Sequence, residues 1–217
     1  MLTTALLAGS LVTGLLTGPV LRRLPEPVGA ESEHKIRYHQ LATRRFAAGV
    51  TICSTAALLA VALRLEPAVW PAWVPLATIG IFLVSIDART TWLPLPLTHL
   101  LWGTTALGLT LALAFAPETE RLHLGLRILL GAAVVGGFFW LFWWFTGGLG
   151  FGDVRLAPVL GATAATVSPN LVVVALLAGT FAGAVHGLLR RARGRAGPFA
   201  YGPALILGVF VALASAR

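Results

Sequence analysis

Residues 147–156 read GGLGFGDVRL, which places Asp153 directly after four glycines and close to the strongly apolar segment 131–145. A carboxylate costs about 2.5 to 3.5 kcal/mol near the centre of a bilayer and less near its surface. Asp153 is therefore a candidate for chemistry. The alternative is a glycine-rich turn between two helices in which Asp153 caps the second helix, because aspartate is a favoured N-cap residue.

The composition assigns the chain to the membrane proteins. Of its 217 residues, 57% are hydrophobic and only 11% are charged, whereas soluble domains average about 25% charged residues. Apolar segments of about 20 residues are long enough to cross a bilayer as helices. We expect an all-α, polytopic membrane helix bundle of about eight transmembrane helices that forms one domain over residues 1–217. The predicted spans are 2–21, 47–63, 69–86, 93–116, 122–145, 154–167, 171–189 and 199–214.

The basic residues are concentrated in the connections between these spans. With eight crossings, the connections 22–46, 87–92, 146–155 and 190–197 share one face, and they hold twelve of the sixteen Lys and Arg residues. Cytoplasmic loops are enriched in Lys and Arg, so this face is predicted to be cytoplasmic and both termini external. The loops account for the net charge of +8, so we expect membrane lipids as partners and no nucleic acid.

A second aspartate strengthens the case for chemistry. Asp87 ends the third predicted span, and Asp87 and Asp153 are the only aspartates in the chain. Two crossings separate them, so both face the same side of the membrane. If the bundle brings them together, the two carboxylates cannot both ionise cheaply, and one holds a proton near neutral pH. The ionised one can take a proton from water while the other donates to a carbonyl, which is acid and base catalysis of amide hydrolysis.

Two stretches around these aspartates resemble the motifs of one family. Residues 150–156, GFGDVRL, are similar to a G-x-G-D-V-K-L signature, with Arg155 in place of the usual Lys. Asp87, followed by Leu93-Pro94 and Leu97-Thr98, is similar to an Asp followed by a Pro and a Leu-Thr pair. Both motifs are those of the type IV prepilin peptidases, which are GxGD intramembrane aspartic proteases. Residues 197–205, GPFAYGPAL, resemble the P-F-G-P-x-L segment that opens the family's last helix, with two residues inserted.

The resemblance implies a membrane-embedded aspartic endopeptidase, built as one transmembrane peptidase domain, with Asp87 and Asp153 as its catalytic residues. The implied partner is a pilin-like precursor protein with a hydrophobic N-terminal helix. The enzyme would cleave its leader peptide at the cytoplasmic face of the inner membrane, as part of a type IV pilus or protein secretion pathway. No cofactor and no metal are expected. The residues expected to form supporting loops around the pair are Gly150, Gly152, Arg155 and Pro94.

Two departures from the family pattern limit what the resemblance implies. The short basic loop from Arg22 to Phe46 has 25 residues and no cysteine. Longer members carry there a large cytoplasmic region with paired cysteines, associated with methylation of the new N-terminus of the pilin. We therefore expect an endopeptidase without N-methyltransferase activity. In addition, Leu95 follows Pro94 where the family usually has an acidic or amide residue.

Other functions remain open from the residues alone. A small polytopic transporter would also keep carboxylates in the membrane, but near its middle. A non-catalytic assembly subunit of a pilus or secretion system would tolerate replacement of both aspartates. The role of Arg155 is open as well, because its charge could favour the ionised form of Asp153 or bind a lipid phosphate.

Overall fold

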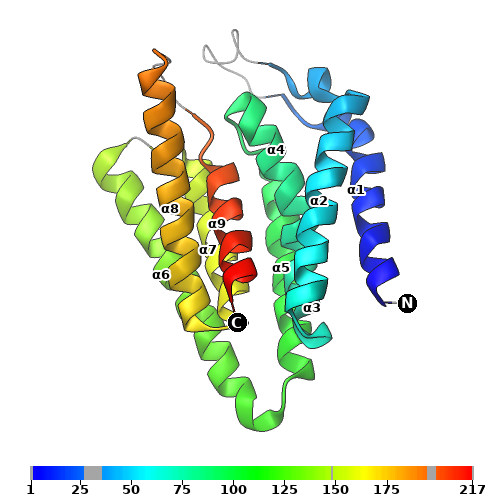
Figure 1. Cartoon of the computed structure of the whole chain (residues 1–217), viewed down its shortest axis with the longest axis vertical. Coiled ribbons are helices and arrows are strands. Elements are labelled where there is room, and N and C mark those ends of the chain that lie inside the picture. The colour runs from blue at the N-terminus through cyan, green and yellow to red at the C-terminus, as the bar shows by residue number, and fades with distance from the viewer. Residues whose placement is uncertain (1, 27–35, 148, 195–198, 217) are drawn as a thin grey trace.

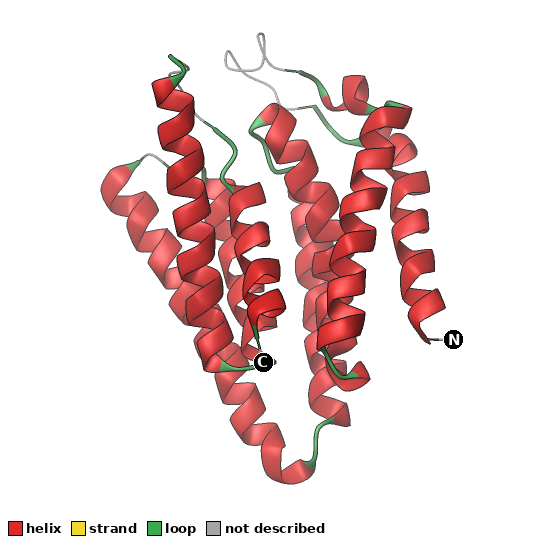
Figure 2. Cartoon of the chain, viewed as in Figure 1, coloured by secondary structure: helices red, strands yellow, loops and turns green. Residues whose placement is uncertain are grey.

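The computed structural model describes residues 2–26, 36–147, 149–194 and 199–216. These residues form eight helical rods and no strand, which confirms the predicted all-α membrane helix bundle (Figure 1, Figure 2). Each predicted span corresponds to one rod, with ends that differ by a few residues. The rods are α1 (Leu2–Arg23), α2 (Arg44–Arg64), a composite third rod, α5 (Leu95–Phe115), α6 (Glu118–Thr146), α7 (Phe151–Ala165), α8 (Pro169–Ala192) and α9 (Gly202–Ser215).

The third rod combines several helix types and lies at the centre of the bundle. It consists of η3 (Pro67–Val69), α3 (Trp70–Pro75), the π-helical η4 (Leu76–Gly80) and α4 (Ile81–Thr90). Pro75 has no N–H to donate within the rod, and the wider π turn follows it directly. In the most apolar window of this rod 72% of the residues are buried, against 22 to 33% in the four other long spans. The rod is therefore enclosed by protein rather than by lipid.

Five of the described helices are long and apolar enough to cross a membrane, and they begin and end at Arg44–Arg64, Pro67–Thr90, Leu95–Phe115, Glu118–Thr146 and Pro169–Ala192. Such helices satisfy their backbone hydrogen bonds internally, as a lipid environment requires. Large apolar side chains are exposed on the outside of the bundle, among them Leu63 and Phe145, each 79% exposed. The 15-residue α7 is shorter, but most of its residues are buried among its neighbours.

Successive rods alternate in direction. The connections α1–α2, α4–α5, α6–α7 and α8–α9 therefore lie at one end of the bundle, and both chain ends point toward the other (Figure 1). We call the first end the basic end, because α1, α4 and α8 end there and their last turns carry Arg22, Arg89 and Arg190. The grouping of these four connections agrees with the sequence prediction. Lys35 and Arg195, which also entered that prediction, lie outside the described residues.

Close helix packing positions the aspartate-bearing ends of α4 and α7. The backbones of α6 and α7 approach so closely that a Cβ atom on Gly131 would lie 2.5 Å from the carbonyl oxygen of Gly161. Helix α9 packs against α8, α7 and α4, and α5 packs against α7. The basic ends of α4, α7 and α9 are thereby brought together, and this is where both aspartates lie.

Candidate active site

Asp87 lies on the last turn of α4 and is 3% exposed. The helix ends shortly after it, because Thr91 adopts a left-handed conformation with φ of 58° and donates its N–H to the carbonyl of Asp87 at 2.7 Å. A β-branched residue is rare in this conformation. The sharp end of α4 lets the chain turn at once into the connection that carries Leu93 and Pro94.

Asp153 lies in the first turn of α7 and is 5% exposed. The N-cap of this helix is Gly150, whose carbonyl accepts the N–H of Asp153 at 3.0 Å. The alternative in which Asp153 serves as the N-cap is therefore wrong. Across the bundle, the indole N–H of Trp102 on α5 donates to the carbonyl of Arg155 at 3.0 Å, which ties the first turn of α7 to α5.

The two carboxylates converge on Gly202, the first residue of α9. Its N–H donates to Oδ2 of Asp87 at 3.2 Å. A Cβ atom built on Gly202 would lie 2.9 Å from that same oxygen and 3.5 Å from Oδ1 of Asp153. Within the described part of the chain, Oδ1 of Asp153 is buried and has no hydrogen-bond partner. Both carboxylates are thus buried beside the same backbone position at the start of α9.

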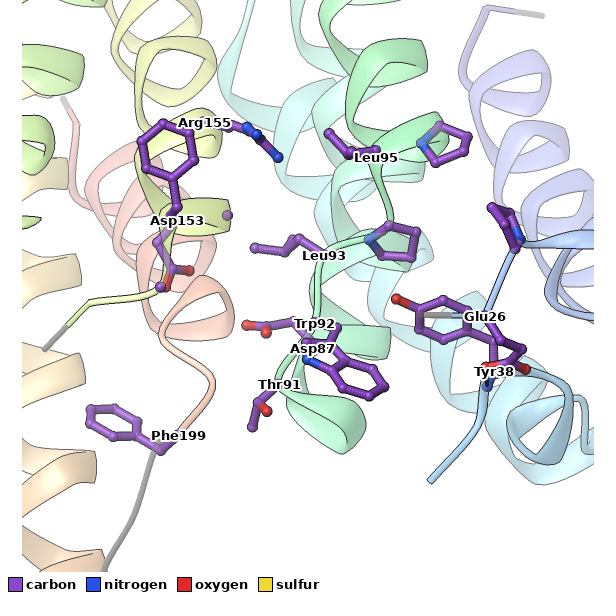
Figure 3. A pocket seen from close by; sticks show the side chains of 16 residues that line it. Glu26, Tyr38, Asp87, Thr91, Trp92, Leu93, Leu95, Asp153, Arg155 and Phe199 are labelled. Carbon is purple, nitrogen blue, oxygen red and sulfur yellow. Dashed lines mark hydrogen bonds between the residues drawn. The ribbon is translucent and has the colours of Figure 1, made fainter. Parts of the chain in front are cut away.

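All six residues predicted for the site line one cavity at the basic end. The cavity has a volume of about 520 Å³. Figure 3 shows Asp153 on one side, Asp87 near the middle, and Leu93 and Leu95 along the wall. The predicted residues in its lining are Asp87, Asp153, Pro94, Gly150, Gly152 and Arg155.

The glycines before Asp153 have separate roles. Gly147 adopts a left-handed φ of 59° and ends α6, as a C-terminal glycine commonly does. Gly152 lies inside α7 and allows close approach, because a Cβ atom there would be 2.6 Å from Cδ1 of Leu93. Gly148 lies outside the described residues.

The guanidinium of Arg155 is directed away from the carboxylate of Asp153. It lies 4.8 Å from the ring centroid of Phe151, and Figure 3 shows it extending into the cavity on the side far from that carboxylate. In the described part of the chain, the two ion pairs are His39 with Glu26 and Arg121 with Glu118. Arg155 therefore forms no ion pair with Asp153 there.

Sequence reasoning missed one wall of the cavity. Glu26 and Tyr38 line it from the connection between α1 and α2, and Phe199 lines it from the segment before α9. No local pattern marks Tyr38, which stands in a charged stretch that reads as a solvated loop. The GPFAYGPAL segment resembles a family motif, but the motif alone does not indicate that the N–H of Gly202 binds a carboxylate.

The comparison with protein families identifies the family of the chain that carries this site. The profile of the type IV leader peptidase family matches residues 74–188, which is more than half of the chain and includes both aspartates. The chain belongs to the type IV leader peptidase family. It is therefore a peptidase of the aspartic class and a multi-pass membrane protein. Comparisons with curated proteins and with solved structures find no match.

The match to the leader peptidase family does not extend to every residue of the cavity. Glu26 and Tyr38 precede the matched stretch, and Gly202 follows it. The family assignment therefore covers the two aspartates. It says nothing about the wall formed by Glu26 and Tyr38, or about Gly202, on which the carboxylates converge.

Proposed function

We propose that Asp87 and Asp153 form one catalytic dyad that cleaves the leader peptide of a pilin-like precursor at the cytoplasmic face of the inner membrane. The convergence of both carboxylates on Gly202, within 3.5 Å of one Cβ position, carries this proposal. In this reading the chain acts as a single transmembrane peptidase domain, and its position in the membrane follows from the basic residues at the end that holds the dyad.

The shared proton defines the chemistry of the dyad. One carboxylate takes a proton from a water molecule as the water oxygen bonds to the carbonyl carbon, and the protonated partner gives its proton to the carbonyl oxygen. When the intermediate collapses, the C–N bond breaks and the leaving nitrogen gains a proton. The products are a free carboxyl group on the leader and a free amine on the mature protein. Water and the two aspartates account for every proton in this sequence.

A substrate with a hydrophobic helix suits the position of the dyad. The apolar helix of the precursor lies among or beside the spans, which leaves the leader junction at the basic end of the bundle. The cavity of about 520 Å³ at that end is large enough for several residues of an extended peptide. Asp87 belongs to the last turn of α4 and Asp153 to the first turn of α7, and these helix ends lie toward one end of the bundle (Figure 1). The transport alternative expects carboxylates near its middle instead.

Replacement of each aspartate by asparagine tests the dyad. Asn is nearly the size of Asp but cannot act as this acid or base, so Asp87→Asn and Asp153→Asn should each abolish cleavage of a precursor peptide while folded protein remains in the membrane. The double variant should lose no more than either single variant, because residues that act as one unit are not additive. Cleavage that persisted in either single variant would contradict the dyad and favour a transport or assembly role.

Orientation and methylation are tested separately. Reporter fusions at residues 30, 89, 150 and 194 should all report the cytoplasm, and an external signal at these sites would reverse the proposed topology. The short loop from Arg22 to Phe46 supports cleavage without methyl transfer. Mass spectrometry of a processed substrate should find an unmethylated new N-terminus, and a methyl group that depended on this protein alone would contradict this part.

A further inference from the structure

Glu26 and Tyr38, from the described ends of the connection between α1 and α2, line the side of the cavity that faces the dyad. Figure 3 shows Tyr38 entering the cavity from the side opposite Asp153, with Asp87 between them. Tyr38 belongs to the short helical turn η2 (Tyr38–Leu41). Residues from both described ends of this connection are thus part of the site.

Glu26 holds Tyr38 in place. Its carboxylate accepts the backbone N–H of Tyr38 at 3.1 Å and that of His39 at 3.2 Å, and it contacts Nδ1 of His39 at 3.0 Å. Burial alone would raise the pKa of Glu26, but these hydrogen bonds outweigh it and hold the pKa below the usual range. Glu26 is therefore ionised at neutral pH and binds the start of η2 firmly.

The ring of Tyr38 has one well-defined position. Only 3% of its surface is exposed, and its ring packs edge to face against Trp92 with centroids 6.4 Å apart. Burial, with smaller contributions from the charges of Glu26 and Asp87, raises the pKa of Tyr38 to about 12. The hydroxyl therefore keeps its proton throughout the physiological range and is available as a hydrogen-bond donor.

We propose that the Tyr38 hydroxyl donates a hydrogen bond to the scissile carbonyl oxygen as that oxygen gains negative charge during attack by water. This proposal rests on the proposed function. It assigns Tyr38 no proton transfer, because the proton that reaches the carbonyl oxygen comes from the dyad and Tyr38 keeps its own. A donor fixed in advance at the place where charge develops stabilises the transition state more than the ground state.

A purely structural role for Tyr38 predicts a different effect of its substitution on activity. If its ring only packs against Trp92, phenylalanine will replace it without loss, because Phe keeps the ring and removes only the hydroxyl. The chain offers a matched control, since its two tyrosines are Tyr38 and Tyr201. The Tyr201 hydroxyl donates to the backbone carbonyl of Thr180 at 3.1 Å, so its loss removes a structural hydrogen bond.

The experiment compares Tyr38→Phe with Tyr201→Phe in full-length protein. The probe is a synthetic precursor with a basic leader that ends in Gly before a hydrophobic helix. We expect Tyr38→Phe to lower kcat about 10²-fold, as removal of one such donor does in other enzymes, with KM and the thermal midpoint unchanged. Tyr201→Phe should lower the thermal midpoint, because it removes the hydrogen bond to Thr180. A wild-type kcat in Tyr38→Phe would overturn the proposal.

A second variant tests whether Glu26 acts through Tyr38. Glu26→Ala should lower kcat in the wild-type background and cause no further loss in the Tyr38→Phe background. An equal loss in both backgrounds would show that the two residues act independently and would contradict the role assigned to Glu26.

The asparagine variants of the dyad separate the two proposals. If those variants are inactive while Tyr38→Phe is fully active, only the role of Tyr38 fails. If the asparagine variants still cleave, the proposed function itself fails.

Discussion

Asp87 and Asp153 reach the first residue of α9 from two different helices, and one oxygen of each lies within 3.5 Å of a Cβ position built on Gly202. Asp87 accepts the N–H of Gly202, whereas Oδ1 of Asp153 faces the same residue without a hydrogen-bond partner in the described part of the chain. The geometry of the pair therefore depends on a third helix that carries neither carboxylate. A substitution on α9 should disturb the site without touching its acids.

Gly202→Ala should slow cleavage strongly. The added methyl group would lie 2.9 Å from Oδ2 of Asp87 and 3.1 Å from Cγ1 of Val84, so Asp87 or α9 must move. Displacement of a catalytic group by about 1 Å costs about 10²-fold in rate, and we expect a loss of that order in kcat with the precursor peptide. Gly103→Ala is the control, because a Cβ atom there has no neighbour within 4 Å. A wild-type rate in Gly202→Ala would contradict the crowding.

Gly152→Ala should also slow cleavage, for a reason that a second substitution can remove. Its Cβ would lie 2.6 Å from Cδ1 and 3.1 Å from Cβ of Leu93, which forces α7 away from the connection after Asp87. Leu93→Ala removes most of the obstructing side chain. The double variant should therefore cleave as fast as Leu93→Ala alone, measured with the same peptide. If the double variant were slower than Leu93→Ala, the close contact between Gly152 and Leu93 would not explain the effect of Gly152→Ala.

The aspartates could be found from the sequence because charge is rare in this chain. Each stands beside an apolar segment where a carboxylate is costly, and counting the crossings between Asp87 and Asp153 was enough to place them at one face. The helical rods could be predicted equally well, since about 20 apolar residues in a row have few alternatives to a membrane helix. These inferences need only composition, segment length and the parity of crossings.

The wall of the cavity formed by Glu26 and Tyr38 could not be predicted from composition, segment length and crossings. Glu26 and Tyr38 lie in a loop where charged and polar residues are ordinary, and the hydrogen bond between them spans twelve positions of the chain. Gly202 resembles any glycine at the start of a helix until the side chains of Asp87 and Asp153 are seen against it. Such contacts come from tertiary packing, and no local period or motif encodes them.

The packing of α6 against α7 should be sensitive at one glycine and tolerant at another. A Cβ atom on Gly131 would meet the carbonyl oxygen of Gly161 at 2.5 Å and the Cβ of Ala165 at 2.7 Å, whereas one on Gly137 has no neighbour within 4 Å. Both glycines lie on α6. Gly131→Val should lower the free energy of unfolding by about 1 to 3 kcal/mol, as overpacking does. Thermal unfolding in detergent should show a clear loss for Gly131→Val and little change for Gly137→Val, and equal losses would contradict this packing.

The two roles considered for Arg155 predict different kinetics. Because Arg155 forms no ion pair with Asp153 among the described residues, its removal should leave the proton shared by the dyad undisturbed. We therefore expect the pH dependence of kcat to be the same in Arg155→Gln, in Arg155→Lys and in the wild type. A pH profile displaced in Arg155→Gln and restored in Arg155→Lys would mean that the charge acts on the carboxylate after all.

The remaining role is the binding of a lipid phosphate, which a guanidinium can hold with two parallel hydrogen bonds. The guanidinium of Arg155 extends into the cavity beside the ring of Phe151 (Figure 3), where a headgroup at the membrane surface could reach it. In vesicles, cleavage by the wild type should rise when phosphatidylglycerol is added to phosphatidylcholine, and cleavage by Arg155→Gln should not. Arg155→Lys keeps the charge but loses the paired geometry, so its response should be intermediate. An equal response in all three proteins would exclude a lipid phosphate at Arg155.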